Sequence, residues 1–194
     1  IRRSENQNSL LVLIIVPTRD LADQILKDVD SFALKFPSVI PQLFIGGNPI
    51  KADLEKISQR TPNIAVATPG RLRELLDAVD PSFFRNLEFL VVDEADRILK
   101  DGMEAHLTTI FESLPRQRRT GIFSATLNPA VKDIIRAGMR NPIYVRITTK
   151  GVVPAELSNY YTLVEPEKKF AQLVHFIKTN VSQKAIVFVL TGAV

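Results

Sequence analysis

The stretch Leu90-Val91-Val92-Asp93-Glu94-Ala95-Asp96 decides how the rest of the chain is interpreted. A short apolar run, Phe89–Val92, ends abruptly in two adjacent carboxylates, and a third follows two residues later. A continuous apolar run of this length is typical of a strand buried on both faces of a parallel sheet. Because open α/β sheets bind ligands at the carboxyl ends of their strands, these acids stand where a ligand site is expected.

Two interpretations of the acids are open at this point. In the first, Asp93 holds a magnesium ion directly or through water, and Glu94 takes a proton from a water molecule that attacks a bound phosphate. In the second, the acids only cap the helix that follows, since acidic residues are common at helix starts.

Composition limits the class of protein. The 194 residues are enough for one large domain, or one domain and part of another, and 45% of them are hydrophobic, which allows a substantial core. The absence of cysteine excludes disulfides and thiolate metal sites and is compatible with a reducing compartment. No apolar run reaches membrane-spanning length, so no membrane partner is expected. The net charge of +4 is compatible with a polyanionic partner.

The chain begins with Ile1 rather than Met and shows no signal peptide, so we expect it to be a piece of a longer protein. Along it, strand-like and helix-like segments alternate. Apolar runs predict six strands, at residues 10–16, 39–45, 64–67, 89–92, 121–123 and 143–147, with Pro41 interrupting the second. Residues at helical spacing predict the helices between them. This repeated order predicts an α/β fold, a parallel sheet with helices on both faces.

Two of the predicted helices carry specific expectations. The first has one apolar face, which we expect to be buried: Leu21, Ile25, Val29, Phe32 and Phe36. A later helix is predicted to begin at Asn128 as its N-cap, with Pro129 at its first position and Gly138 near its end.

The second part of the chain is predicted to open a further domain. Residues 148–157 contain Gly151 and Pro154, lack periodicity and predict a linker. After it, the pattern restarts with a strand at 160–164, a helix at 170–177 and a strand at 185–190. The predicted domains are therefore residues 1–147 and the beginning of another in residues 158–194.

Four turns that follow predicted strands share one kind of chemistry. They are Pro17-Thr18-Arg19, Gly46-Gly47, Thr68-Pro69-Gly70-Arg71 and Ser124-Ala125-Thr126. On a parallel sheet they would gather at the same edge as Asp93. Hydroxyls, guanidinium groups and helix N-termini bind phosphates, and glycines let another main chain approach closely. Each turn alone is ordinary, but together they indicate a site for a phosphate backbone.

These motifs, in this order, resemble those of the DEAD-box RNA helicases, a RecA-like group of superfamily 2. Asp93-Glu94-Ala95-Asp96 matches the motif that names the family, and Pro17 to Ala22 resembles its Pro-Thr-Arg-Glu-Leu-Ala motif with Asp20 in place of Glu. The other three turns match the next three motifs. Residues 186–188 resemble the first strand-motif of the second RecA-like domain, and residues 159–161 with 169–176 resemble the branch of the family that works in ribosome assembly.

The resemblance implies a role for each motif. Asp93 would act on Mg²⁺, through water, and Glu94 would orient and deprotonate the water that attacks ATP. Asp96 would bind the turn of Ser124 and Thr126 and link the nucleotide state to domain closure. The residues implied to line the RNA path are Pro17, Thr18, Arg19, Gly46, Gly47, Thr68, Gly70 and Arg71.

One motif of the family is absent: no Gly-x-x-x-x-Gly-Lys-Thr/Ser loop, the P-loop that cradles ATP phosphates, occurs in the sequence. The resemblance places its strand in the centre of the sheet, beside the strand that ends in Ser124. We therefore expect a first RecA-like domain that is incomplete at its N-terminus, exposes sheet edges and apolar faces, and has low stability alone. We expect the longer protein to which the chain belongs to be an ATPase, and we expect the chain alone to be inactive.

Two alternatives stay open. One is a superfamily 2 motor that acts on DNA or double-stranded RNA, although such motors usually carry His where Asp96 stands. The other is a non-catalytic RNA- or protein-binding module that has lost its P-loop. The expected partners are ATP and RNA, the latter held by its backbone without strong sequence preference. Accessory proteins are further partners that the resemblance allows. The expected location is intracellular, with the nucleus or nucleolus and the cytoplasm both open.

Overall fold

The computed structural model describes residues 9–147, 157–180 and 184–189. The chain divides into two compact units, Ile1–Tyr144 and Val145–Val194. This division falls just before the domain boundary predicted at residue 147. The predicted linker, apart from Leu157, lies outside the described residues.

The first unit is built on a five-stranded parallel sheet with the strand order β2-β3-β1-β4-β5. In the register of this sheet, Phe44, Ala67, Ile15, Val92 and Ile122 lie side by side at the ends of their strands. The predicted parallel sheet is therefore confirmed, and all its carboxyl ends meet at one edge. The strands are β1 (Val12–Ile15), β2 (Pro41–Phe44), β3 (Ile64–Ala67), β4 (Phe89–Val92) and β5 (Arg119–Ile122).

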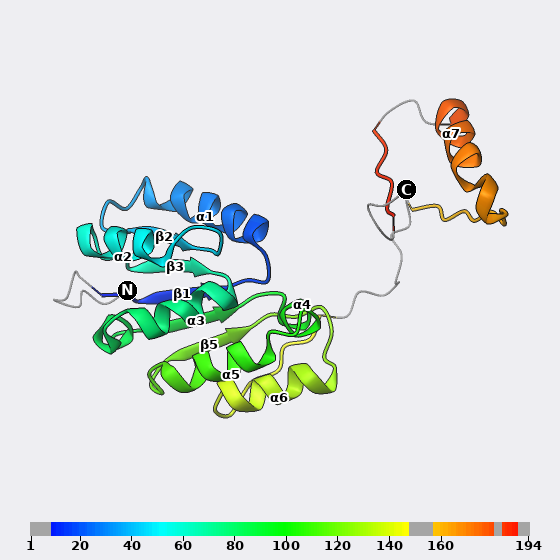
Figure 1. The fold of residues 1–194 in the computed structure, drawn as a ribbon. Coiled ribbons are helices and arrows are strands. Elements are labelled where there is room, and N and C mark those ends of the chain that lie inside the picture. The colour runs from blue at the N-terminus through cyan, green and yellow to red at the C-terminus, as the bar shows by residue number, and fades with distance from the viewer. Residues whose placement is uncertain (1–8, 148–156, 181–183, 190–194) are drawn as a thin grey trace. The chain divides into compact units, whose positions relative to one another are not determined.

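Helices lie on both faces of the sheet, as predicted, but cover them unequally (Figure 1). The larger part of the core lies between one face and α3, α4 and α5, and the smaller part lies beneath α1 on the other face. Asn128 caps α6 as predicted, accepting a hydrogen bond from the Val131 amide at 2.9 Å. The helices are α1 (Arg19–Ala33), α2 (Ile50–Gln59), α3 (Pro69–Ala78), α4 (Ala95–Lys100), α5 (Glu104–Ser113) and α6 (Pro129–Gly138), with a short 3₁₀ helix at Pro81–Phe84.

Burial of β4 on both faces, predicted from its apolar run, is wrong for one face. Leu90 and Val92 are buried against the larger core, whereas Phe89 and Val91 are only half-buried. The physical reason is that α1 contacts β2 and β3 on that face and does not extend over β4. Uncovered apolar side chains are what we expected of an incomplete sheet.

The strand predicted at residues 143–147 does not form. These residues are extended but unpaired, and Ile143, Val145 and Ile147 are each at least 85% exposed. A strand forms only where its backbone hydrogen bonds with a neighbour, and residues 143–147 do not pair with β5, which pairs with β4 alone among the described strands. The open outer edge of β5 agrees with the expectation that this sheet exposes an edge.

The predicted buried face of α1 is right near its start and wrong near its end. Leu21 and Ile25 pack beneath the helix, but Phe32 is 69% exposed, and Phe36 lies beyond the helix and is 58% exposed. A fifteen-residue helix is about 22 Å long, whereas a four-residue strand spans only about 13 Å. The last turns of α1 therefore extend past the sheet. Pro41 begins β2 instead of interrupting a longer strand.

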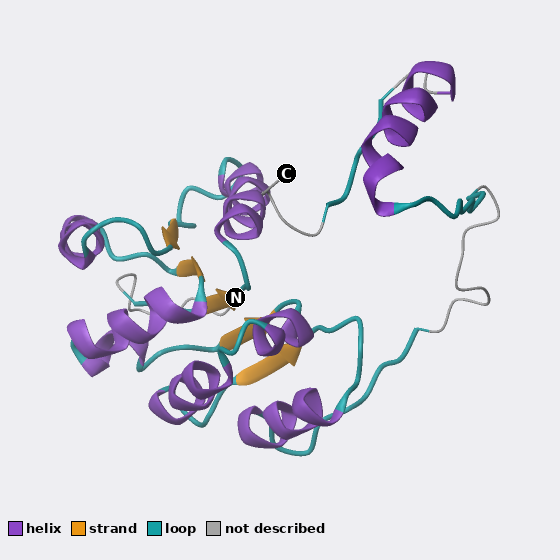
Figure 2. Ribbon diagram, turned by 45° about the vertical axis from the view of Figure 1, so that its right-hand side comes forward, coloured by secondary structure: helices purple, strands orange, loops and turns teal. Residues whose placement is uncertain are grey.

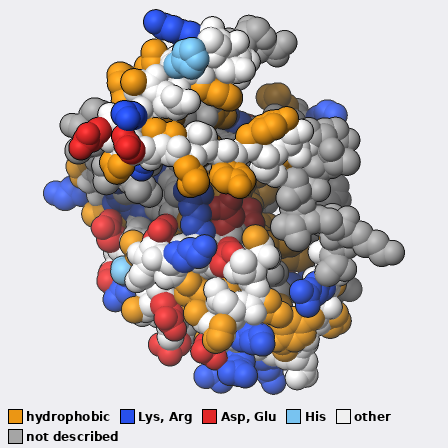
Figure 3. Space-filling view, turned by 90° about the vertical axis from the view of Figure 1, so that its right-hand side faces the viewer, with side chains coloured by type: hydrophobic (Ala, Val, Ile, Leu, Met, Phe, Trp, Pro, Cys, Tyr) orange, Lys and Arg blue, Asp and Glu red, His pale blue; other side chains and the backbone are white. Residues whose placement is uncertain are grey.

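The second unit contains a 3₁₀ turn (Pro166–Lys168) that leads into helix α7 (Lys169–Asn180), which confirms the helix predicted there. The strand predicted at 160–164 is wrong, and the one at 185–190 is wrong over its described residues, which form loops (Figure 2). No described strand of this unit offers a partner. Hydrophobic side chains of this unit consequently lie exposed, including Tyr160, Tyr161 and Phe188. Figure 3 shows hydrophobic side chains, coloured orange, on one face of the molecule. None of the described helices could cross a membrane by its length and apolarity.

Candidate functional site

The predicted site residues gather at the carboxyl edge of the sheet because the five strands end in register. Backbone hydrogen bonds tie the loops to neighbouring strands. The Asp93 amide donates to Ile15 O at 2.9 Å, and the Ala95 amide donates to Phe123 O at 3.0 Å. The acidic turn is thus held between the ends of β1 and β5.

The turn of Asp93 and Glu94 has an unusual backbone. Glu94 lies in the left-handed region, with φ of 47° and ψ of 48°, and its amide donates to Asp93 Oδ1 at 2.9 Å. Its side-chain oxygen Oε2 accepts a hydrogen bond from Arg97 Nη1 at 3.2 Å, in an ion pair that is about half exposed. Glu94 occupies the N-cap position of α4 but makes no capping hydrogen bond with its side chain. Helix capping therefore does not account for the Glu94 carboxylate.

Asp96 reaches the predicted turn after β5. Its Oδ2 accepts a hydrogen bond from Thr126 Oγ1 at 2.9 Å, and its Oδ1 accepts one from the Arg97 amide at 3.1 Å. Burial by itself raises the pKa of Asp96. Hydrogen bonds from Thr126, Ser124 and the Arg97 amide outweigh it and hold the pKa below its usual value. A charged Asp96 thus ties α4 to the Ser124–Thr126 turn across thirty residues of sequence.

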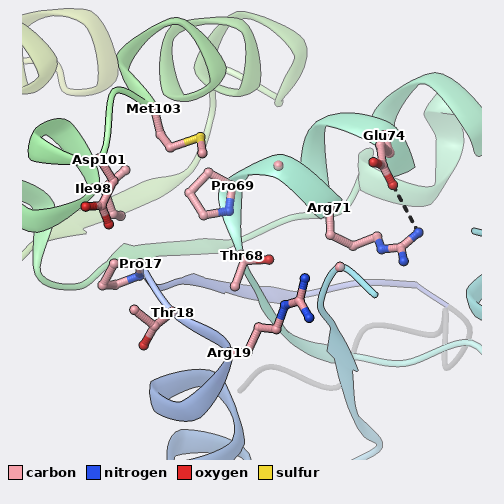
Figure 4. Close-up of a pocket in the computed structure, with 12 residues that line it drawn as sticks. Pro17, Thr18, Arg19, Thr68, Pro69, Arg71, Glu74, Ile98, Asp101 and Met103 are labelled. Atoms are coloured by element: carbon pink, nitrogen blue, oxygen red, sulfur yellow. Dashed lines mark hydrogen bonds and ion pairs between the residues drawn. The ribbon is translucent and has the colours of Figure 1, made fainter. Parts of the chain in front are cut away.

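A cavity of about 340 Å³ opens at the same edge, between the starts of α1 and α3 (Figure 4). Seven of the eight residues predicted to line an RNA path line this cavity. They are Pro17, Thr18, Arg19, Gly46, Thr68, Gly70 and Arg71, and the eighth, Gly47, lies against Arg19 beside it. Asp93 and Glu94 do not line it. The structure therefore brings the predicted RNA residues together and keeps the acids at a separate place on the edge.

The N-termini of α1 and α3 supply polar groups to this cavity. Thr18 caps α1, because its Oγ1 accepts from the Leu21 amide at 3.3 Å, whereas the Thr68 hydroxyl makes no such bond with α3. The exposed guanidinium of Arg19 lies against the two-glycine turn: a Cβ atom at Gly47 would lie 2.9 Å from Arg19 Nη1. Helix N-termini and a free guanidinium together suit an anion.

Arg71 lines the cavity, and its guanidinium is held by partners within the chain. Its side chain is only 2% exposed, and its guanidinium donates to Ile45 O at 3.1 Å, to Glu74 Oε2 at 3.0 Å and to Asn48 O. It also forms an ion pair with Asp53 Oδ2 at 3.5 Å. Each nitrogen of this guanidinium therefore has an internal partner, and a contact between Arg71 and RNA stays a prediction.

Asp53 is the site residue that sequence reasoning missed. It is 5% exposed, and burial raises the pKa of its carboxyl, while the charge of Arg71 opposes that rise. The signal was present in the sequence, since Asp53 shares the apolar helical face of Ile50, Leu54 and Ile57. A charge on such a face indicates a buried ionic partner.

The acids suit a magnesium ion only in part. Among the described residues, no group of three or more His, Cys, Asp or Glu side chains could enclose a metal. Asp96 is engaged by Thr126, which leaves Asp93 as the carboxylate placed to face an ion, with one oxygen already accepting the Glu94 amide. This donor set fits magnesium, which binds through one or two carboxylates and keeps several waters and phosphate oxygens.

Comparison with known proteins gives a consistent result. The family model described as "DEAD/DEAH box helicase" matches residues 1–134. The chain is 42% identical over 207 aligned residues to human "ATP-dependent RNA helicase DDX55", covering all of this chain and 34% of that protein. It is 38% identical over 199 aligned residues to Arabidopsis thaliana "DEAD-box ATP-dependent RNA helicase 49", covering all of this chain and 36% of that protein. The chain thus spans about a third of the length of these relatives.

Among solved structures, the chain resembles Mss116p bound to single-stranded RNA and AMP-PNP. The TM-score is 0.62 at 33% sequence identity, and the match covers 70% of this chain and 28% of that one. A second structure of Mss116, bound to single-stranded RNA and UDP-BeF, gives the same TM-score and identity. The match confirms that the sheet is RecA-like and partial, as predicted.

Proposed function

Because the chain belongs to the DEAD/DEAH box helicase family, we propose that it is part of an ATP-dependent RNA helicase. In this proposal the chain binds RNA and activates the water that attacks ATP. The observation that carries this proposal is the joint placement of five loops at one sheet edge, with the Asp96–Thr126 hydrogen bond joining two of them. The names of the relatives, which are RNA helicases, support RNA and ATP as the ligands.

The proposed chemistry divides between two places on this edge. RNA lies in the cavity at the starts of α1 and α3, where Arg19, Thr68 and the Gly70 backbone meet its phosphates and sugars. Glu94 orients and deprotonates the water that attacks the terminal phosphate of ATP. Asp93 would hold a magnesium ion, which would neutralise phosphate charge when bound. The Asp96–Thr126 contact couples the nucleotide to domain closure.

The sequence analysis left a non-catalytic RNA- or protein-binding module as the alternative, because these 194 residues contain no P-loop motif. Steady-state ATP hydrolysis by the full-length protein, with and without single-stranded RNA, separates the two. An RNA helicase hydrolyses ATP faster with RNA. RNA binding without any hydrolysis identifies the binding module, and stimulation by DNA as strong as by RNA identifies a motor of another class.

A narrower proposal is that the full-length protein works in ribosome assembly, inside the cell. It is supported by the resemblance of residues 159–161 and 169–176 to that branch of the family and, for the compartment, by the absence of cysteine. Sedimentation of tagged protein through sucrose gradients tests it. Co-migration with precursor ribosomal particles is expected, and migration only with free protein contradicts the proposal.

A further inference from the structure

The two-glycine turn between β2 and α2 is held from both sides by arginines of different character. Arg71, from α3, is buried beneath the turn, and its guanidinium donates to the carbonyls of Ile45 and Asn48, which flank Gly46-Gly47. Arg19, from α1, is exposed and lies against the same glycines on the cavity side (Figure 4). One arginine supports the turn, and the other rests on it.

The two glycines leave room for the Arg19 guanidinium against the turn. Gly47 has a φ of +116°, and a Cβ atom there would lie 2.9 Å from Arg19 Nη1. A Cβ atom at Gly46 would lie 3.4 Å from Arg19 Nη2. The Arg19 guanidinium therefore lies close to the turn, and Arg71 binds the carbonyls on either side of the same turn.

The positive charge of Arg71 is paired with carboxylates of the chain itself, without any ligand. Asp53 lies 3.5 Å from Arg71 Nε, with its side chain 7% exposed, and Glu74 accepts from Nη1 at the surface. A buried guanidinium with carboxylate and carbonyl partners is electrostatically satisfied and has a fixed direction. Arg71 therefore has a structural role in the site.

We propose that Arg71, braced by Asp53, is a positioning residue for RNA binding: it sets the Ile45–Asn48 turn so that Arg19 meets a phosphate, and it does not touch RNA itself. The inference rests on the proposed function, because it assumes that RNA phosphates occupy the cavity. It assigns the direct contact to Arg19 alone and makes Arg71 act only through Arg19.

The test measures binding of the chain to a short fluorescent oligouridylate over a series of salt concentrations. Arg19→Ala should lower the slope of log K against log salt by about 0.7, the value for one phosphate contact on a single strand. Arg71→Lys keeps the charge near Asp53 but cannot bridge two carbonyls, so it should weaken binding about tenfold and lower the slope by the same amount. Asp77→Asn, at an exposed acid of the same helix that pairs with Arg73 outside the cavity, is the matched control and should bind as the unsubstituted chain does.

The double variant distinguishes positioning from contact. If Arg71 acts only through Arg19, then Arg19→Ala with Arg71→Lys binds no more weakly than Arg19→Ala alone. A further loss of affinity or slope in the double variant would mean that Arg71 meets RNA independently and would overturn the inference. Parent-like affinity of the Arg71→Lys variant would overturn it as well.

Failure of the proposed function has a different signature. If the unsubstituted chain binds no oligouridylate at all, the RNA assignment fails. The effect of Arg71 on the position of the turn can still be measured in that case. NMR amide signals of Gly46 and Gly47 should shift in Arg71→Lys and stay in place in Asp77→Asn. Unshifted glycine signals in Arg71→Lys would overturn the inference without reference to RNA.

Discussion

Glu94 combines a left-handed backbone with a carboxylate that pairs only with the exposed Arg97 side chain. A residue other than glycine in this region costs on the order of 1 kcal/mol or more and persists where the surrounding structure enforces it. Here the enforcing contacts are the Asp93 carboxylate on the Glu94 amide and the Ala95 amide on Phe123 O. The strain directs the side chain away from the capping position and is consistent with a role in chemistry.

We therefore predict the effect of Glu94→Gln in the full-length protein. Glutamine keeps the shape and the backbone but removes the base, so ATP should still bind while turnover falls by about a hundredfold or more. Steady-state hydrolysis with saturating RNA measures the turnover, and a fluorescent ATP analogue measures the binding. Unchanged turnover would remove Glu94 from its assigned role.

The hydrogen bonds of Asp96 predict how the stability of the chain depends on pH. Its pKa in the folded chain is below the ordinary 3.8, chiefly because hydrogen bonds from Thr126 and Ser124 outweigh the effect of burial. A carboxyl whose folded pKa is depressed contributes stability above its unfolded pKa and loses that contribution as pH falls through the folded value. The chain should therefore begin to lose stability as the pH falls below about 4, the ordinary carboxyl range, and should lose more as the pH falls through the lower pKa of folded Asp96.

Urea unfolding at several pH values checks this prediction. The free energy of unfolding of the parent should fall more steeply on acidification than that of Asp96→Asn, which has no carboxyl to protonate at this position. Thr126→Val, which removes the donor to Asp96, should give an intermediate slope. Parallel curves for the parent and Asp96→Asn would show that the Asp96–Thr126 bond does not contribute to the pH dependence.

At the scale of elements, α5 and α6 approach closely at a single glycine. A Cβ atom at Gly138, at the end of α6, would lie 2.6 Å from the Phe111 ring of α5, which is only 5% exposed. Glycine is a weak helix former, but here its missing side chain lets the two helices meet. This explains why a helix with a strong apolar face ends in glycine.

Gly138→Ala should consequently destabilise the chain, although alanine favours helices. The gain in helix propensity is about 1 kcal/mol at most, whereas overpacking a buried ring costs about 1–3 kcal/mol. The expected result is a lower unfolding midpoint by circular dichroism. Adding Phe111→Leu to Gly138→Ala should recover part of the loss, because the smaller side chain makes room. Stabilisation by Gly138→Ala alone would contradict this packing argument.

At the scale of the whole chain, the absence of a P-loop motif from the sequence limits how the chain can bind ATP. The ATP phosphates lack the lysine and backbone amides that provide most of a protein's charge-assisted grip on them. Asp93 alone would hold magnesium weakly, because the ion needs the nucleotide's oxygens to complete its shell. The edge of the sheet that carries the acids thus offers only part of a nucleotide site within this chain.

We therefore predict that the chain as printed neither binds magnesium-ATP with micromolar affinity nor hydrolyses it, while RNA still binds weakly through the cavity beside Arg19. Isothermal titration calorimetry with magnesium-ATP measures the first, and oligouridylate binding under the same conditions serves as the positive control. A saturable micromolar isotherm from this chain would reveal a nucleotide site that neither the motifs nor the described residues indicate.

The sequence by itself determined the order of strands and helices in the first unit and the position of every motif turn. These signals are local: Phe89–Val92 is apolar and ends in charge, and Asn128-Pro129 begins a helix by its own side-chain chemistry. A parallel sheet then brings the turns to one edge without further information. The candidate site was therefore predictable as a set of residues.

Only the tertiary structure decided which apolar segments pair and what each charged side chain contacts. Residues 143–147 include Ile143, Val145 and Ile147, which favour a strand, yet they stay unpaired although the outer edge of β5 is open, because pairing depends on the path of the chain relative to the sheet. Arg19 and Arg71 follow similar threonine-containing turns, yet one is exposed and the other is buried beside Asp53. Burial and partners depend on residues far away in sequence, so a local pattern cannot distinguish an arginine that meets a ligand from one that holds the loop in place.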